Sequence, residues 1–351
     1  MRRKEFRKHS KGSSKKKLAL KISLLLALSL LLSLTAYGVY LTKKVEHAAN
    51  NAYEVAGQKG STLRDNEVQP VSDNVSILFI GVDNSEARNQ GERNTRTDAL
   101  MVATLNNKDK SVKLLSIPRD SYVYIPEAGY EDKITHAYGH GGTRVTIETV
   151  EELLEIPIDY YVKMDFNAFI DVVDALDGIT VDVPFNRLEK DENDRRTVQL
   201  TKGLQTLDGR HALALARTRY VDNDIERGKR QQMILEAVID KATSASSFTK
   251  YGDVIDAVGG NMKTDMTFDE MTSFFNYIKG GKPQIDSLSL TGDDDMSTGT
   301  YYWILDEEDL EETRDILKAH LGLTTDTSNL SDGSSSIQDP THTAQGQYDE
   351  D

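Results

Sequence analysis

Three arginines and a glutamine lie close together in the sequence, around a single turn that precedes a helix. They are Arg217, Arg219, Arg227 and Gln231. An arginine side chain presents a planar fork of N–H donors that fits phosphate oxygens in pairs and stays charged at any relevant pH. Arg227 and Gln231 are four residues apart, so they share one helical face near the helix N-terminus, where free N–H groups and the helix dipole favour an anion. This spacing favours a phosphate site.

A second group of arginines lies upstream. Arg96 and Asp98 are two residues apart and share one face of a predicted strand. Arg119 and Asp120 follow Pro118, which fixes the backbone where another predicted strand ends. A single surface arginine is usually solvated or salt-bridged, and that is the alternative for each of these residues. Their recurrence beside several turns favours a shared diphosphate ligand.

Two carboxylates sit at the ends of neighbouring predicted strands. Asp83 closes the apolar run 75–82, and Asp98 opens the run 99–105. Such strand ends often face one crevice in an open α/β sheet. Mg²⁺ binds one or two carboxylates together with phosphate oxygens. Turn residues are the alternative, since aspartate is common in turns. The two arginine groups mixed with carboxylates suggest a pyrophosphate held by arginines and Mg²⁺.

Lys133 and His136 lie in a loop before the first helix of the domain. Lys133 is a further cation for the phosphates. His136 is a possible general base, but a lone histidine in a turn more often caps or packs, and only geometry tests the catalytic role. Arg230 lies one residue off the face of Arg227 and Gln231, which indicates a structural role.

The elements that position these residues follow from hydrophobic periodicity and turn signals. The predicted strands cover residues 75–82, 99–105, 112–117, 160–164, 179–183, 285–290 and 301–305. The predicted helices cover residues 143–154, 166–176, 209–215, 225–245, 251–258, 268–278 and 307–321, with Asp165 and Asp208 as N-caps. Pro157 is expected to end the first of these helices, and residues 217–220 to be extended or turning. This alternation indicates an α/β domain with a layered sheet, in which 179–183 returns after a helix.

Residues 22–41 form an apolar run without a charge, long enough as a helix to cross a bilayer core. The basic residues before it predict a signal anchor with residues 1–21 in the cytoplasm and the rest outside. The alternative is a cleavable signal peptide, with Ala36-Tyr37-Gly38 as the cleavage site. We expect a juxtamembrane stalk at 42–74, a catalytic core at 75–245, a C-terminal part of the same outer domain at 246–322 and a disordered tail at 323–351.

The charge of the chain is divided unevenly. Twelve Lys and Arg residues stand against Glu5 in the first 44 residues, while the whole chain carries −15. The acidic remainder excludes general nucleic-acid binding, which needs a basic face. The chain contains no cysteine, so an outer domain of this size relies on its own hydrophobic core rather than on disulfides.

Several ordered motifs resemble one family, the LytR–CpsA–Psr proteins. The resemblance covers roughly residues 75–245 and also matches the anchor topology; the chain from about residue 250 matches only loosely. The motifs are Arg96-Thr97-Asp98, Ser116-Ile117-Pro118-Arg119-Asp120, Lys133-Ile134-Thr135-His136-Ala137-Tyr138, residues 174–184 and residues 217–232. One departure is the acidic stretch 221–226, where the family pattern leads us to expect a glycine or an aromatic residue before Arg227.

The resemblance implies a three-layer α/β/α domain with a central mixed sheet and an apolar groove for a prenyl chain. It implies an extracytoplasmic phosphotransferase that moves a glycopolymer, such as teichoic acid or capsule, from an undecaprenyl pyrophosphate carrier to peptidoglycan. Asp83 and Asp98 would bind Mg²⁺ by this resemblance. The pyrophosphate would be held by Arg96, Arg119, Arg217, Arg219, Arg227 and Gln231, with Lys133 nearby.

Three points stay open at the level of sequence. Arg119, Asp98 and Asp120 are the candidate catalytic residues, and either aspartate could take the proton of the acceptor hydroxyl. Water instead of a glycan would make the protein a polyprenyl pyrophosphate hydrolase. A membrane-anchored regulator or sensor of wall synthesis is a third hypothesis, although the N-terminal segment is too short for a folded DNA-binding domain.

Overall fold

A computed structural model gives the fold of this chain. The structure describes residues 12–57, 59–82, 97–218, 224–244, 262–274 and 283–323. Asp83, Arg96 and Arg219 lie outside the described residues, as do the helix predicted at 251–258 and residues 324–351.

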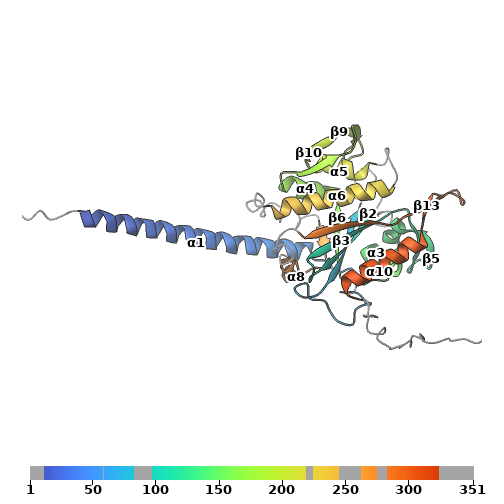
Figure 1. The fold of residues 1–351 in the computed structure, drawn as a ribbon, viewed down its shortest axis with the longest axis horizontal. Helices are drawn as coiled ribbons and strands as arrows, with labels where there is room; N and C mark the ends of the chain where they lie inside the picture. Colours follow the sequence, from blue (N-terminus) through green and yellow to red (C-terminus); the bar gives the residue numbers. More distant parts are fainter. Residues whose placement is uncertain are drawn as a thin grey trace, which may run out of the picture.

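A mixed six-stranded sheet forms the centre of the domain (Figure 1). Its strand order is β11-β6-β1-β2-β3-β12; β1 is parallel to β6 and β3 to β12, while the other neighbours are antiparallel. The strands are β1 (Val75–Val82), β2 (Thr97–Asn106), β3 (Ser111–Ile117), β6 (Tyr160–Asp165), β11 (Met262–Thr264) and β12 (Gln284–Ser289). The near-continuous apolar runs of β1 and β2 are typical of strands covered on both faces. The last third of the chain therefore contributes two strands to the same sheet.

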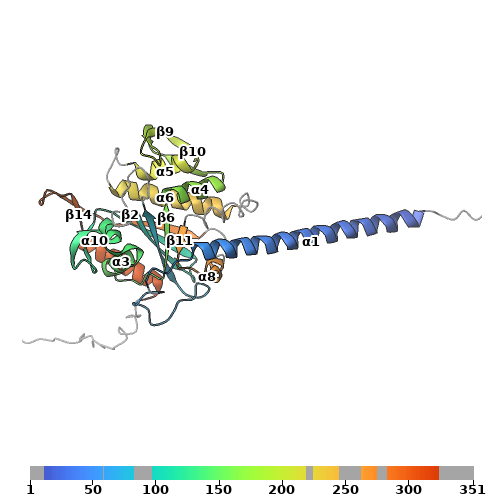
Figure 2. The same ribbon diagram turned by 180° about the vertical axis from the view of Figure 1, so that it is seen from behind.

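Helices cover both faces of this sheet, which confirms the three-layer architecture (Figures 1 and 2). One layer contains α3 (Ala137–Leu154) and α10 (Glu307–Leu321), and the opposite layer contains α4 (Phe166–Ala175), α5 (Gly209–Arg217) and α6 (Asp224–Thr243). Leu78 and Leu100 pack with Leu154 of α3 and Leu317 of α10. The other face of the sheet packs partly against Leu235 of α6.

The described residues also form four two-stranded ribbons outside the central sheet. They are β4 (Tyr122–Ile125) with β5 (Tyr130–Lys133), β7 (Ile179–Val183) with β10 (Gly203–Leu207), β8 (Arg187–Lys190) with β9 (Arg196–Leu200), and β13 (Gly292–Asp295) with β14 (Tyr302–Leu305). The expectation that 179–183 returns to the layered sheet is wrong, because β7 pairs with β10. Thr180 and Asp182 are exposed while their neighbours are buried, an alternation typical of a strand with one solvated face.

The helix ends bear on two further expectations. Helix α3 ends at Leu154, which is the predicted limit, and Glu155 after it adopts a left-handed conformation. Arg217 is the last residue of α5 rather than part of an extended segment. The predicted caps are confirmed, since the side chains of Asp165 and Asp208 accept hydrogen bonds from the backbone of the helices that follow them.

Helix α1 (Gly12–Ala52) projects away from the domain and joins it at its C-terminal end (Figures 1 and 2). Beyond it, Glu54 donates its backbone N–H to the carbonyl of Thr264 in β11, and Arg64 pairs with the buried Asp159 at 2.8 Å. Short elements complete the fold: a 3₁₀ turn (Ile134–His136) and α8 (Phe268–Ser273). None of the helices within the described ranges combines the length and the apolar character that crossing a membrane requires.

His320 at the end of α10 should make stability depend on pH. Its two ring nitrogens contact the hydroxyls of Thr104 and Ser111 at 2.7 and 2.9 Å. Burial, and then the charge of Lys113, lower the pKa of His320 below its ordinary value of 6.5. Protonation therefore favours the unfolded chain. We expect the free energy of unfolding to fall as pH drops below about 6.5 towards the folded-state pKa.

Urea unfolding of the wild type and of His320→Gln between pH 5 and 7.5 checks this expectation. The wild type should lose more stability at the acid end than the variant does. Asp265, whose pKa burial raises to about 6, is present in both proteins, so its opposite contribution cancels in the difference. Parallel pH profiles for the two proteins would contradict the role of His320.

Candidate functional site

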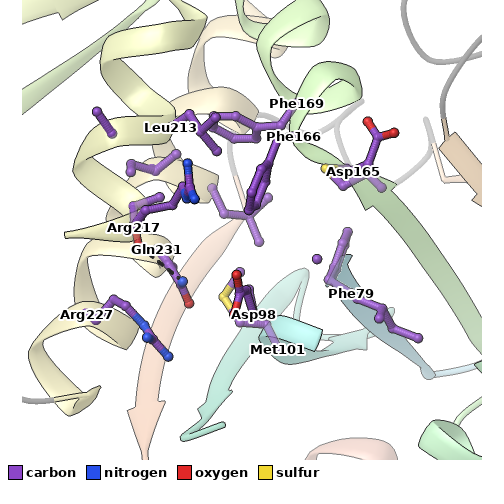
Figure 3. Close-up of a pocket in the computed structure, with 18 of the residues that line it drawn as sticks. Phe79, Asp98, Met101, Asp165, Phe166, Phe169, Leu213, Arg217, Arg227 and Gln231 are labelled. Atoms are coloured by element: carbon purple, nitrogen blue, oxygen red, sulfur yellow. Dashed lines mark hydrogen bonds between the residues drawn. The ribbon is translucent and has the colours of Figure 1, made fainter. Parts of the chain in front are cut away.

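A cavity of about 610 Å³ lies between the central sheet and the layer of α4, α5 and α6 (Figure 3). Strands β1, β2 and β6 supply its floor, and the three helices supply its opposite wall. The turn of the β8–β9 ribbon completes one side through Glu189, Lys190 and Asp194. The helices predicted at 166–176 and 225–245 line the cavity, whereas the contributions of α5 and of the ribbon were not indicated by the sequence.

Five of the predicted site residues meet at this cavity. Asp98, Arg119, Arg217, Arg227 and Gln231 all line it, although they come from β2, the segment after β3, α5 and α6. Figure 3 shows Arg217, Gln231 and Arg227 on the helical side and Asp98 on the strand side. Asp98 and Arg217, which are 119 positions apart in the sequence, therefore face the same cavity.

Arg119 is held between two carboxylates. Its Nη1 donates to Asp98 at 2.5 Å, and its Nε lies 3.4 Å from Asp120. Asp120 also accepts from Lys133 at 2.8 Å. Asp120 and Lys133 do not line the cavity, so the structure places them beside Arg119 rather than in the cavity wall. His136 contacts Asp132 at 2.8 Å and is likewise not a lining residue.

Arg217 is oriented by the turn between β8 and β9. Its guanidinium donates to the carbonyl of Asp191 at 3.0 Å and to the carboxylate of Asp194 at 3.1 Å. Its other face lies over the ring of Phe166, 4.2 Å from the centroid. Such stacking and ion pairing fix the direction of a long side chain. Arg217 therefore reaches the cavity in a defined orientation.

The turn that holds Arg217 is itself stabilised by a buried carboxylate. Asp191 accepts hydrogen bonds from the backbone N–H groups of Asn193 and Arg195 and from the hydroxyl of Thr197. Burial alone would raise the pKa of Asp191, but these hydrogen bonds outweigh it and lower the pKa below its usual range. Sequence analysis missed this turn, because residues 191–195 look like any polar turn rich in aspartate and asparagine.

Helix α6 lies close against the sheet because of a glycine. A Cβ on Gly228 would come within 2.5 Å of the Ser116 hydroxyl in β3, so only glycine allows this approach. Gln232 then donates to the main-chain carbonyls of Leu114 and Leu288, at 2.9 and 2.7 Å. These contacts place Arg227 and Gln231, on the neighbouring face of α6, at the cavity.

The remaining polar residues of α6 are paired. Arg227 is buried and contacts Asp224 at 3.1 Å. Gln231 donates to the carbonyl of Ala216, the residue before Arg217, at 3.3 Å. Arg230 donates to the carbonyl of Thr218 at 2.9 Å and is not a lining residue, which confirms its structural role.

The larger part of the cavity is apolar. Its lining comes from all three helices and all three strands, and none of these side chains can form a hydrogen bond to a ligand. The apolar lining residues include Phe79, Met101, Val162, Met164, Phe166, Phe169, Val172, Leu213, Ile234, Leu235 and Val238. A ligand with an anionic group that reaches the arginines and an apolar chain along the rest therefore fits this lining.

The donor set for a metal is incomplete within the described residues. Asp98 offers a carboxylate in the cavity wall, and a hard oxygen donor of this kind fits Mg²⁺ beside phosphate oxygens. No group of three or more His, Asp or Glu side chains that could hold an ion is found in the described ranges. Asp83, the second predicted ligand, lies outside them.

Comparison with known proteins agrees with this geometry. The model of the LytR_cpsA_psr family matches residues 38–319. TagT of Bacillus subtilis, named a polyisoprenyl-teichoic acid–peptidoglycan teichoic acid transferase, is 40% identical over 291 residues, or 82% of this chain and 89% of TagT. TagU of Halalkalibacterium halodurans, which has the same functional name, is 37% identical and covers 83% of this chain and 94% of TagU.

Solved structures give the same result. A structure of TagT with bound octaprenyl pyrophosphate lipid is 36% identical, covers 77% of this chain and 99% of that one, and superposes with a TM-score of 0.62. A structure of TagT bound to the compound named LI-WTA is 39% identical over the same shares, with a TM-score of 0.66. The family match spans most of the described domain and includes every residue that lines the cavity. This chain therefore belongs to the LytR–CpsA–Psr family.

Proposed function

We propose that this protein is a phosphotransferase that moves an anionic glycopolymer from a polyprenyl pyrophosphate carrier to peptidoglycan. The observation that carries this proposal is one cavity with three arginines, each beside a carboxylate, at one end (the cationic end) and apolar side chains along the rest. The names of the relatives and the octaprenyl pyrophosphate in a TagT structure support it. Teichoic acid is the polymer in those names.

The apolar part of the cavity fits the prenyl chain. Each CH₂ group removed from water contributes roughly 0.8 kcal/mol, so a few buried isoprene units supply most of the binding free energy. The lipid itself does not react, and its burial in the cavity fixes the position of the attached phosphates. Arg119, Arg217, Arg227 and Gln231 surround the end at which the diphosphate would lie.

The reaction breaks the bond between the two phosphates. A hydroxyl oxygen of the glycan acceptor attacks the phosphorus that carries the glycopolymer. A new P–O bond forms to the acceptor, and the bond from that phosphorus to the bridging oxygen breaks. Polyprenyl monophosphate leaves with the electron pair. The fork-shaped donors of the arginines stabilise the negative charge that builds up on it.

The geometry favours Asp98 over Asp120 as the group that takes the hydroxyl proton. Asp98 lines the cavity, whereas Asp120 contacts Arg119 and Lys133 and does not. Asp120 then acts as a positioning residue for the two cations. Asp98 also orients Arg119 through their hydrogen bond of 2.5 Å.

Asp98, together with Asp83, would also hold Mg²⁺ next to the diphosphate. The ion would supply positive charge that neutralises phosphate oxygens during transfer. The support within the described residues is the position of the Asp98 carboxylate. The resemblance to the family supports the role of Asp83, Arg96 and Arg219.

We also propose that residues 22–41 anchor the protein in the cell membrane, with the N-terminus in the cytoplasm and the domain outside. The charge-free run lies within α1, between Lys21 and Lys43. A membrane-anchored enzyme stays in the plane in which its lipid carrier diffuses. This placement supports the chemistry above.

Replacing Arg217 by lysine should reduce transfer roughly tenfold to a hundredfold. Lysine keeps the charge but loses the paired donors and the stacking on Phe166. The measurement is the rate of transfer from a lipid pyrophosphate donor to a glycan acceptor by the purified protein. Arg144→Lys is the matched control, because Arg144 lies on α3 in an exposed ion pair. Transfer by Arg217→Lys at the wild-type rate would contradict the assignment.

A charge in the apolar part of the cavity should weaken binding of the lipid. Val238→Asp places a carboxylate against the prenyl chain, and its desolvation should raise the Kd for octaprenyl pyrophosphate about tenfold or more. Val238→Leu keeps the wall apolar and should bind within about twofold of the wild type. Calorimetry or lipid-dependent thermal shift gives both values. Equal affinities for the Asp and Leu variants would show that the prenyl chain binds elsewhere.

Removal of divalent metal should stop transfer. EDTA is expected to abolish activity and added Mg²⁺ to restore it. Asp98→Asn should weaken Mg²⁺ binding about tenfold or more, because an amide oxygen is a poorer ligand than a carboxylate. Calorimetric titration of Mg²⁺ into the complex with octaprenyl pyrophosphate measures this without turnover. Undiminished transfer in EDTA is the result that rejects the metal.

A further inference from the structure

The acceptor glycan needs a binding surface, and the cavity does not supply one. Beyond Arg119 the polar residues continue outwards through Asp120 to Lys133. The Nζ of Lys133 lies 5.6 and 5.7 Å from the ring centroids of Tyr301 and Tyr302. Aromatic side chains therefore begin where the cationic end of the cavity stops.

Strand β4 extends this aromatic region. Its residues alternate between exposed and buried, and the exposed ones are Tyr122 and Tyr124, with 37% and 45% of their surface accessible. The rings of Tyr122 and Tyr302 meet edge to face with centroids 4.8 Å apart. Tyr122, Tyr124, Tyr301 and Tyr302 thus form one feature, which we name the tyrosine surface.

The tyrosine surface is held rigidly next to Arg119. The backbone N–H of Trp303 in β14 donates to the carbonyl of Asp120 at 2.9 Å, and Ser121 forms a β-bridge with Trp303. Strand β4 pairs with β5 in regular register, which brings Lys133 opposite Tyr122. The two ribbons lie at the same end of the domain in Figure 1. Their position relative to the reacting end of the cavity is therefore fixed by main-chain bonds.

The charges around the tyrosine surface select against a polyanion. Tyr124 stands opposite Glu131, and the hydroxyl of Tyr301 donates to Asp294 at 2.7 Å. An anionic glycopolymer would be repelled by these carboxylates. Uncharged sugar rings are not repelled, and their C–H faces stack on aromatic rings while their hydroxyls reach tyrosine hydroxyls and carboxylates. Isolated exposed apolar residues need no explanation, but a contiguous group beside a reactive cavity marks a binding site.

We propose that the tyrosine surface binds the sugar rings of the acceptor glycan and directs one of its hydroxyls to the cationic end of the cavity. This inference rests on the proposed function, because only a transferase needs an acceptor there. The donor lipid fills the apolar part of the cavity, so the glycan approaches from the side of Lys133. Tyr124 is a binding residue and not a catalytic one.

Direct binding tests the surface without any reaction. Trp303 is the only tryptophan of the chain and lies in β14 beneath the surface, so its fluorescence reports on binding there. A soluble, uncharged oligosaccharide of N-acetylglucosamine, the neutral sugar of the peptidoglycan glycan, should change the fluorescence of the full-length protein in a saturable manner. Tyr124→Ala should raise the Kd about tenfold, and Tyr124→Phe should retain most of the affinity. Tyr53→Ala is the matched control: Tyr53 is a similarly exposed tyrosine near the end of α1.

Two results with the uncharged glycan overturn the proposal. One is unaltered glycan affinity in Tyr124→Ala and in the double variant Tyr122→Ala/Tyr124→Ala. The other is an equal loss of affinity in Tyr53→Ala. A titration with purified anionic glycopolymer completes the test: binding of this polymer in place of the uncharged glycan also rejects the proposal.

Steady-state kinetics separate this inference from the proposed function. In Tyr124→Ala the KM for the acceptor should rise about tenfold, while octaprenyl pyrophosphate binds as in the wild type. If the glycan changes the Trp303 fluorescence of the wild type but the wild type never transfers the glycopolymer to it, the proposed function is rejected and glycan binding at the tyrosine surface is retained. If the wild type transfers the glycopolymer and Tyr124→Ala keeps the wild-type KM for the acceptor, glycan binding at the tyrosine surface is rejected and the proposed function is retained.

Discussion

The guanidinium groups of Arg119, Arg217 and Arg227 converge on one end of the cavity, and the structure depends on offsetting their mutual repulsion. Like charges in a partly buried site repel one another, and each loses solvation. Every described arginine at the cavity therefore has a carboxylate beside it: Asp98 for Arg119, Asp194 for Arg217 and Asp224 for Arg227. These acids keep the side chains ordered. In the proposed function they would also let a diphosphate bind by exchange with existing partners, so that the ligand would not be held too tightly to leave.

The fold meets this requirement by bringing distant segments against one sheet. Asp98 starts β2 and Arg119 follows β3, which are neighbours in the sheet. Arg227 and Gln231 come from α6, which Gly228 and Gln232 fix against β3 and β12. Arg217 depends on a turn with its own buried carboxylate, Asp191. The site is thus rigid because each arginine is attached to a different, independently stabilised element.

Much of the fold and of the candidate site could be predicted from the sequence. Strand β1 and helix α10 have the predicted limits, because a continuous apolar run and a clear helical period need little tertiary help. The convergence of Asp98, Arg119, Arg217, Arg227 and Gln231 followed from their residue types and from the family motifs. The β8–β9 turn could not be recognised, because its function lies in main-chain carbonyls and a buried aspartate whose partners are set only by the fold. The place of β7 in a separate ribbon was hidden for a similar reason, since strand pairing is a long-range property. Asp83, Arg96 and Arg219 remain predictions.

The apolar cavity has a consequence for the heat stability of the protein. It occupies a position between sheet and helices where a domain of this architecture would normally place close-packed core, and its walls are Leu, Val, Met and Phe side chains. A hydrocarbon tail there would serve as a piece of that core and tie the α4–α6 layer to the strands. Because a ligand that binds only the native state adds to its stability, the melting temperature should report how much of the protein carries lipid. The protein would then be most stable with lipid bound and would unfold most easily after one lipid has left and before the next has bound.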